Sequence, residues 1–131
     1  VCPHHGPSLG LDANGRHHAV WFTQAPKNPG VFYSRLHAGG VESARRVGGD
    51  AAEHADLAVD GIRIAVAWKE FDGTHMRLRA MLSDDAGMHW RSRELAAVDD
   101  ATDQPRVLVR DRTFHVFWNT RREPLKTLAL A

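Results

Sequence analysis

The chain has 131 residues, a length that suits one domain with a buried core. Seventeen basic and sixteen acidic side chains give a formal net charge of +1 without a long run of one sign, so nothing points to nucleic acid. No apolar stretch approaches the roughly 20 residues of a membrane span, and a single cysteine excludes an internal disulfide.

The first seven residues, Val-Cys-Pro-His-His-Gly-Pro, place one thiol and two imidazoles close together. Cys2, His4 and His5 are ligand types that suit Cu(I) or Zn(II). Three ligands this close could hold a linear or trigonal copper ion, whereas four-coordinate zinc would need a further histidine from the rest of the chain. The alternative is a solvated chain end with an incidental pair of histidines.

The rest of the chain is typical of short strands separated by turns, with no helical period. Three segments share one pattern, in which a polar turn leads into a β-rich strand that ends on Trp21, Trp68 or Trp118. Asn14-Gly15 and Asp60-Gly61 are strong hairpin signals at two of these turns. The tryptophans are 47 and 50 residues apart. A period of about 45 residues, with four strands per unit, is typical of β-propeller blades.

This period divides the single domain into three units, residues 7–47, 55–98 and 104–131, the last one strand short. We expect an all-β fold of four-stranded antiparallel blades that do not make a full ring. The chain is then either a piece of a larger propeller or one member of a homo-oligomer that closes the ring. The expected strands, in chain order, are Ser8–Asp12, His17–Thr23, Gly30–Leu36, Glu42–Val47, Asp56–Val59, Arg63–Lys69, Met76–Ser83, Trp90–Leu95 and, last in the third unit, Leu125–Ala131.

The most specific motif lies in the second unit and reads Ser83-Asp-Asp-Ala-Gly-Met-His-Trp90, which fits the spacing Ser-x-Asp-x-Gly-x-x-Trp. Asp85 can accept hydrogen bonds from backbone N–H groups across a tight turn, and Gly87 can take the positive φ that the turn demands. Trp90 opens the returning strand and can bury its ring. Shifted by 47 residues, the motif falls on Leu36–Ser43, which keeps the glycine. The spacing resembles the Asp box of sialidase-type β-propellers, a folding device rather than a catalytic one.

The resemblance implies where a ligand would bind. Sialidases of this class are similar in holding a carboxylate with three arginines and in using an aspartate acid/base and a tyrosine nucleophile activated by glutamate. Tyr33 is the only tyrosine of the chain, and Arg35 and Arg79 lie on expected strands where they could contact a ligand. No activating glutamate can be assigned, and the arginine-containing segment of the sialidase N-terminus is absent.

Three hypotheses for function follow. The leading one is a non-catalytic, sialidase-like module that binds a carbohydrate or a protein and is periplasmic or secreted, although the chain shows no signal peptide. The second is an extracytoplasmic protein that binds copper or zinc through Cys2, His4 and His5. The third is the remnant of an exo-sialidase. Carbohydrate is the expected ligand by family analogy alone.

Overall fold

The structure, a computed structural model, describes residues 6–130, and this range contains strands and turns but no helix. No helix long and apolar enough to cross a membrane is therefore found among these residues. The strands, in chain order, are β1 (Ser8–Leu11), β2 (His17–Thr23), β3 (Gly30–His37), β4 (Gly40–Val41), β5 (Arg45–Val47), β6 (Ala52–Asp60), β7 (Arg63–Phe71), β8 (Met76–Ser83), β9 (Arg91–Val98), β10 (Arg106–Arg110), β11 (Thr113–Trp118) and β12 (Lys126–Leu130).

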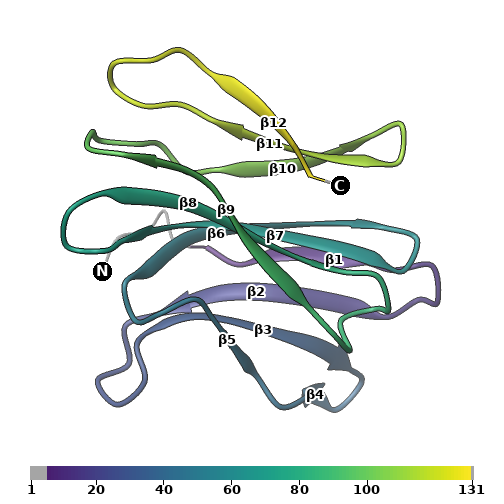
Figure 1. Ribbon diagram of the computed structural model, residues 1–131. Helices are drawn as coiled ribbons and strands as arrows, with labels where there is room; N and C mark the ends of the chain where they lie inside the picture. The colour runs from purple at the N-terminus through teal and green to yellow at the C-terminus, as the bar shows by residue number, and fades with distance from the viewer. Residues whose placement is uncertain (1–5, 131) are drawn as a thin grey trace.

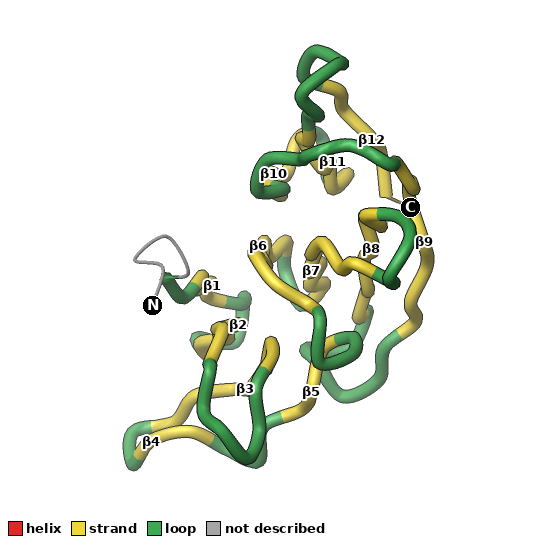
Figure 2. Tube along the Cα trace, turned by 90° about the vertical axis from the view of Figure 1, so that its left-hand side faces the viewer, coloured by secondary structure: helices red, strands yellow, loops and turns green. Residues whose placement is uncertain are grey.

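The strands form three antiparallel sheets, each made from consecutive strands. The first has the order β1-β2-β3-β4 with β5 also paired to β3, the second β6-β7-β8-β9 and the third β10-β11-β12. Figure 1 shows the three sheets stacked one above another. In Figure 2 the first strands of the sheets, β1, β6 and β10, lie next to one another, and the later strands spread outward. This is the blade arrangement of a β-propeller whose ring is not closed.

Each expected strand has a counterpart, with one clear difference in the first sheet. The single strand expected over Glu42–Val47 is instead two short strands, β4 and β5. Where the ladder is interrupted, the hydroxyl of Ser34 donates to the Glu42 carbonyl at 2.9 Å. Other differences concern strand ends: β6 begins at Ala52, before the expected Asp56, β9 begins one residue after Trp90, and β12 begins one residue after Leu125.

Two apolar cores hold the sheets together. The core between the first and second sheets joins Val20, Val31 and Tyr33 to a face of the second sheet that carries Ile64 and Trp68. On each strand these side chains share one face of the sheet, because alternate residues of a strand point to the same face. Full burial of such a side chain stabilises the fold by about 1.5–3 kcal/mol.

The opposite face of the second sheet builds the other core. There Ala65 and Ala67 of β7 pack with Phe114, Val116 and Trp118 of β11. The small alanines of β7 make room for the larger side chains of β11 in this core. The second sheet is therefore buried on both faces, whereas each of its neighbours has one face that no other described sheet covers.

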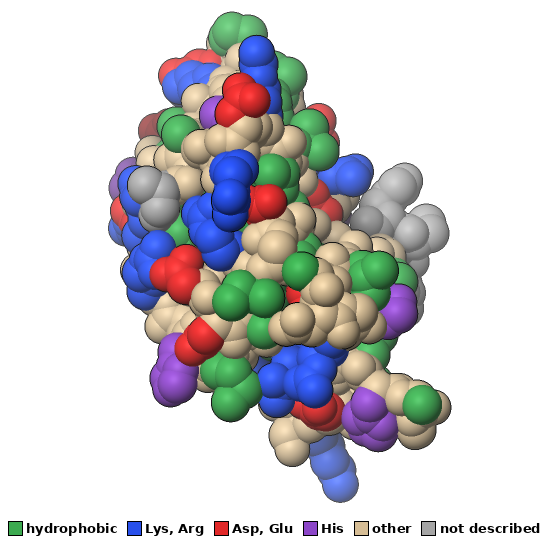
Figure 3. Space-filling model, turned by 90° about the vertical axis from the view of Figure 1, so that its right-hand side faces the viewer, with side chains coloured by type: hydrophobic (Ala, Val, Ile, Leu, Met, Phe, Trp, Pro, Cys, Tyr) green, Lys and Arg blue, Asp and Glu red, His purple; other side chains and the backbone are tan. Residues whose placement is uncertain are grey.

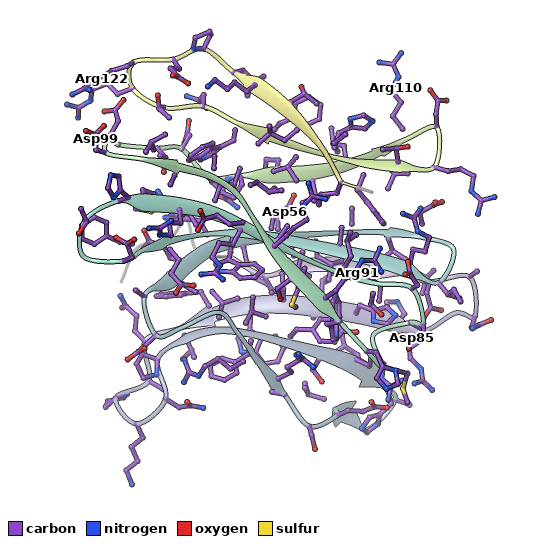
Figure 4. All side chains as sticks on the ribbon, viewed as in Figure 1. Asp56, Asp85, Arg91, Asp99, Arg110 and Arg122 are labelled. Atoms are coloured by element: carbon purple, nitrogen blue, oxygen red, sulfur yellow. The ribbon has the colours of Figure 1, made fainter. Side chains whose placement is uncertain are left out.

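Asp56 on β6 links the first strands of all three sheets. Its Oδ1 accepts a hydrogen bond from the Ser8 hydroxyl of β1 at 2.8 Å. Its Oδ2 accepts from the Val107 backbone N–H of β10 at 2.7 Å and from Arg106 Nε at 3.1 Å. Figure 4 shows Asp56 in the middle of the stack. Because its side chain is only 8% exposed, this carboxylate depends on these donors for its solvation.

Candidate functional site

The turn between β8 and β9 is closed by the motif residues themselves. Asp85 Oδ1 accepts hydrogen bonds from the His89 backbone N–H at 2.9 Å and from the Ser83 hydroxyl at 2.8 Å. The N–H of Gly87, whose φ is +87°, donates to Ser83 Oγ at 2.9 Å. Trp90 Nε1 donates back to the Gly87 carbonyl at 3.1 Å. The motif thus organises its own hairpin.

Two neighbouring carboxylates at this turn are held in their ionised form. The backbone N–H of His89, followed by its side chain, keeps the pKa of Asp85 well below its usual value. A hydrogen bond from Arg91 is the largest cause that lowers the pKa of Asp84. Figure 4 shows Asp85 and Arg91 at this end of the second sheet. In Figure 3 acidic and basic side chains are interspersed over this side of the molecule, so its surface charge is not of one sign.

A chain of buried hydrogen bonds runs through the first sheet toward the second. His18 is fully buried, and its Nε2 lies 2.7 Å from Asp12 Oδ2 while its Nδ1 lies 2.6 Å from Tyr33 Oη. Because a carboxylate only accepts, Nε2 carries a proton and donates it to Asp12 in this hydrogen bond. Asp12 Oδ1 also accepts from the backbone N–H groups of Asn14 and Arg16. The arrangement orders the β1–β2 turn and positions the phenol.

The ionisation states of the side chains in this hydrogen-bonded series follow from their surroundings. Burial alone would raise the pKa of Asp12, but hydrogen bonds from His18, Arg16 and Asn14 outweigh it and lower the pKa. Burial, with smaller effects of nearby charges, raises the pKa of Tyr33 far above its ordinary value. Tyr33 is therefore a neutral phenol at physiological pH, and Asp12 is a carboxylate.

Tyr33 also contacts the motif of the neighbouring sheet. A side-chain carbon added at Gly87 would collide with Tyr33 Oη, so only glycine leaves room for the phenol. The Tyr33 and Trp90 rings meet edge to face with centroids 4.9 Å apart. The hydrogen-bonded chain that begins at Asp12 thus ends against the β8–β9 turn.

Two surface hollows lie where the first and second sheets meet. The first, which we call the Tyr33 hollow, has a volume of about 680 Å³ and is lined by Tyr33, Arg35, Glu42, Arg45 and Gly87 among others. Arg35 Nε donates to Glu42 Oε2 at 2.9 Å, and Arg35 Nη1 lies 3.1 Å from the sulfur of Met88. Arg35 is thus already paired with the one acidic side chain of this hollow.

The second, which we call the Arg79 hollow, has a volume of about 300 Å³ and lies at the β5–β6 connection. Arg45, Trp68, Glu70, Arg79 and Ser92 are among its lining residues. Glu70 Oε1 accepts from Trp68 Nε1 at 3.0 Å. Arg79 Nε is buried and has no hydrogen-bond partner among the described residues.

Comparison with solved structures supplies one informative likeness. A crystal structure of an exo-1,5-alpha-L-arabinanase from a bovine ruminal metagenomic library superposes on 94% of this chain with a TM-score of 0.56 and 13% sequence identity. The chain shares the fold of propeller blades. It spans 51% of the arabinanase chain, so it corresponds to about half of that protein's length. No protein-family model and no curated protein matches the sequence.

The residues expected to contact a ligand fall into two places. Tyr33 and Arg35 line one hollow together, whereas Arg79 lines the other, and Arg45 reaches both. Sequence reasoning did not single out Arg45 or the role of His18. Strand register determines the position of both residues. The β2–β3 pairing places Tyr33 opposite Val20, which is two residues along β2 from His18, and the β3–β5 pairing places Arg45 opposite Tyr33.

The expected metal ligands Cys2, His4 and His5 lie outside the described residues, so copper or zinc binding by this segment stays a prediction. Within residues 6–130, no group of three or more His, Cys, Asp or Glu side chains could hold a metal ion. His18, which could have supplied a further imidazole, has both ring nitrogens engaged by Asp12 and Tyr33.

Proposed function

We propose that the chain is a non-catalytic, sialidase-like Asp-box propeller module that binds carbohydrate. The observation that carries this proposal is the state of the acidic groups at the two hollows. Each hollow is lined by a single carboxylate, Glu42 in one and Glu70 in the other, and protein donors already engage both. The arabinanase with the same fold supports carbohydrate as the ligand class.

The acidic groups argue for binding without hydrolysis. Cleavage of a glycosidic bond by the usual route needs two carboxyl groups about 5–10 Å apart, one of them protonated as a general acid. The hollows lack such a pair among their lining residues. Asp84 and Asp85 are adjacent, but their pKa values are both lowered, so neither would be protonated at neutral pH.

The position of Tyr33 argues against a remnant of sialidase chemistry. A tyrosine nucleophile needs a neighbouring base that draws off its proton as the bond forms. Although Tyr33 Oη lies 2.6 Å from Nδ1 of the buried His18, burial raises the pKa of the phenol, which disfavours the phenolate that would attack. With 3% of its surface exposed, Tyr33 lies deeper than a group that attacks a sugar would.

The test is retention of the purified chain on immobilised oligosaccharides, including neutral arabinan fragments and acidic glycans, alongside assays for sugar release. We expect retention without release, and no turnover of a fluorogenic sialoside. Arg35→Gln should weaken retention on any glycan that occupies the Tyr33 hollow, whereas Arg122→Gln, on an exposed loop of the third sheet, should not. Absence of retention on every glycan would overturn the proposal in favour of a protein ligand. Turnover that disappears in Tyr33→Phe would establish catalysis instead.

A further inference from the structure

The Arg79 hollow contains positive charge that the described protein does not neutralise. Arg79 Nε is buried without an acceptor, although nearly all buried polar groups in folded proteins have a hydrogen-bond partner. A guanidinium is ionised at every physiological pH and can only donate. Because Arg79 also lines the hollow, its guanidinium is placed to meet an acceptor from outside the chain.

The acidic residue of the hollow does not serve as that acceptor. Glu70 Oε1 receives the Trp68 indole N–H at 3.0 Å and the Gly49 backbone N–H at 3.2 Å. The ion pairs of the described residues include none between Glu70 and an arginine. Glu70 thus anchors the Gly48–Gly49 connection to Trp68 and forms no ion pair with Arg79.

A second arginine reinforces the charge from the first sheet. Arg45 lines the same hollow, and among the described residues it forms neither an ion pair nor a side-chain hydrogen bond. The adjacent Arg46 differs, because its guanidinium donates to the Pro29 carbonyl at 2.6 Å and to Asn28. The hydroxyl of Ser92, which also lines the hollow, is a further donor.

We propose that the Arg79 hollow binds an oxyanion, the carboxylate or sulfate group of an acidic carbohydrate, through Arg79 and Arg45 with help from Ser92. The planar fork of a guanidinium matches the paired oxygens of such groups, and charge-assisted bonds of this type are the strong ones. A volume of about 300 Å³ suits one sugar residue rather than an extended chain. The choice of a carbohydrate rests on the proposed function, whereas the oxyanion site itself rests on the arginines.

The experiment uses two kinds of probe on the whole chain. The first is titration with sodium sulfate and with sodium galacturonate at constant ionic strength, followed by tryptophan fluorescence because Trp68 lines the hollow. The second is retention on paired oligosaccharides that differ only in whether they carry a carboxylate or sulfate. Galacturonate-selective binding would assign a uronic acid, and sulfate-selective binding a sulfated sugar.

Matched variants decide whether the site is responsible. Arg79→Gln and, separately, the exposed Arg45→Gln should each weaken binding of the preferred anion roughly tenfold or more. Arg110→Gln removes the same charge from an exposed turn of the third sheet, labelled in Figure 4, and should leave the affinity unchanged. Equal weakening in all three would mean a general charge effect and overturn the inference. Arg45→Gln keeps the test decisive if Arg79→Gln does not fold.

The two proposals fail in different ways. Retention on neutral oligosaccharides that Arg79→Gln does not change would overturn the oxyanion site and leave the carbohydrate-binding function standing. Arginine-dependent binding of sulfate or galacturonate without retention on any oligosaccharide would support the oxyanion site and overturn the carbohydrate function. Absence of any response to both anions would overturn the oxyanion site.

Discussion

Gly87 is the residue at which two constraints from different parts of the molecule meet. Within its own turn it has a φ of +87°, a conformation that side chains disfavour. From the neighbouring sheet, Tyr33 Oη occupies the space that a side chain would need. Tyr33 is in turn held by His18 and Asp12. Gly87, which the motif requires for its own turn, therefore also allows the first sheet to pack against the second.

We expect Gly87→Ala to lower the free energy of unfolding by roughly 2–4 kcal/mol, from a strained φ and an overpacked contact together. Gly61→Ala is the matched control, since Gly61 has a φ of +66° with open space around it, and it should cost about 1–2 kcal/mol. Urea denaturation measures both. In Gly87→Ala combined with Tyr33→Phe, the loss should be smaller than the sum of the single losses. Equal losses for the two glycines would show that the Tyr33 contact does not matter.

At the scale of elements, β6 connects its two neighbours near the inner edge of the stack. The backbone N–H of Val107 on β10 and the hydroxyl of Ser8 on β1 both donate to Asp56 of β6. The strand has a β-bulge between Glu53 and Asp56, with His54 at a φ of +51°. The bulge shifts the strand register so that Asp56 lies opposite Ala67 of β7. One carboxylate thereby supplements the two apolar cores in holding three sheets together.

Asp56→Ala should destabilise the fold by about 3 kcal/mol, because it leaves the Val107 N–H without its buried acceptor. Arg106 contributes little of this, since its side chain is 66% exposed and water can replace the contact. Asp56→Asn retains one acceptor oxygen and should lose less. Asp99→Ala, which removes the exposed ion pair with Arg122 shown in Figure 4, should change stability by less than about 1 kcal/mol. A loss at Asp56 no larger than at Asp99, in the same denaturation series, would contradict the argument.

At the scale of the whole molecule, the first sheet has an apolar face without a neighbour among the described residues. Trp68 and Trp118 are each 2% exposed because the preceding sheet covers them. Trp21, which the repeat places at the equivalent position, is only partly buried and stacks on Phe32. On β1 of the same sheet, Leu9 and Leu11 are also exposed. The face therefore has the composition of a blade interface, and we propose that a second copy of the chain covers it.

If copies associate through this face, sedimentation should give a mass of at least twice the 14.6 kDa of one chain. Leu9→Lys should shift the equilibrium toward the single chain, because it places a charge where an apolar contact is expected. Phe71→Lys, at a side chain that is 50% exposed at the end of β7, is the control because the second sheet is already covered on both faces, and it should leave the mass unchanged. A mass of one chain at every concentration would overturn the proposal.

The β-architecture and the β8–β9 turn could be predicted from the sequence because both depend on neighbours in the chain. Turn residues and the tryptophan repeat act over a few positions or at a constant interval, so the strands occur close to where the pattern predicts them. Ser83, Asp85 and Gly87 bond among themselves and need no distant partner to form their hairpin. The same local logic could not anticipate the break at Glu42, where the Ser34 hydroxyl of the neighbouring strand bonds to the backbone carbonyl.

The candidate sites were decided only by the tertiary structure. Tyr33, Arg35 and Arg79 were expected as ligand contacts, and the structure places Tyr33 and Arg35 in one hollow and Arg79 in the other, with Arg45 lining both. The burial of His18 between Asp12 and Tyr33 likewise requires three strands or turns to meet. A sequence shows which side chains can donate or accept, but register and sheet packing determine which of them find a partner. That Arg79 Nε lacks a hydrogen-bond partner can be known only from the positions of its neighbours in the folded structure.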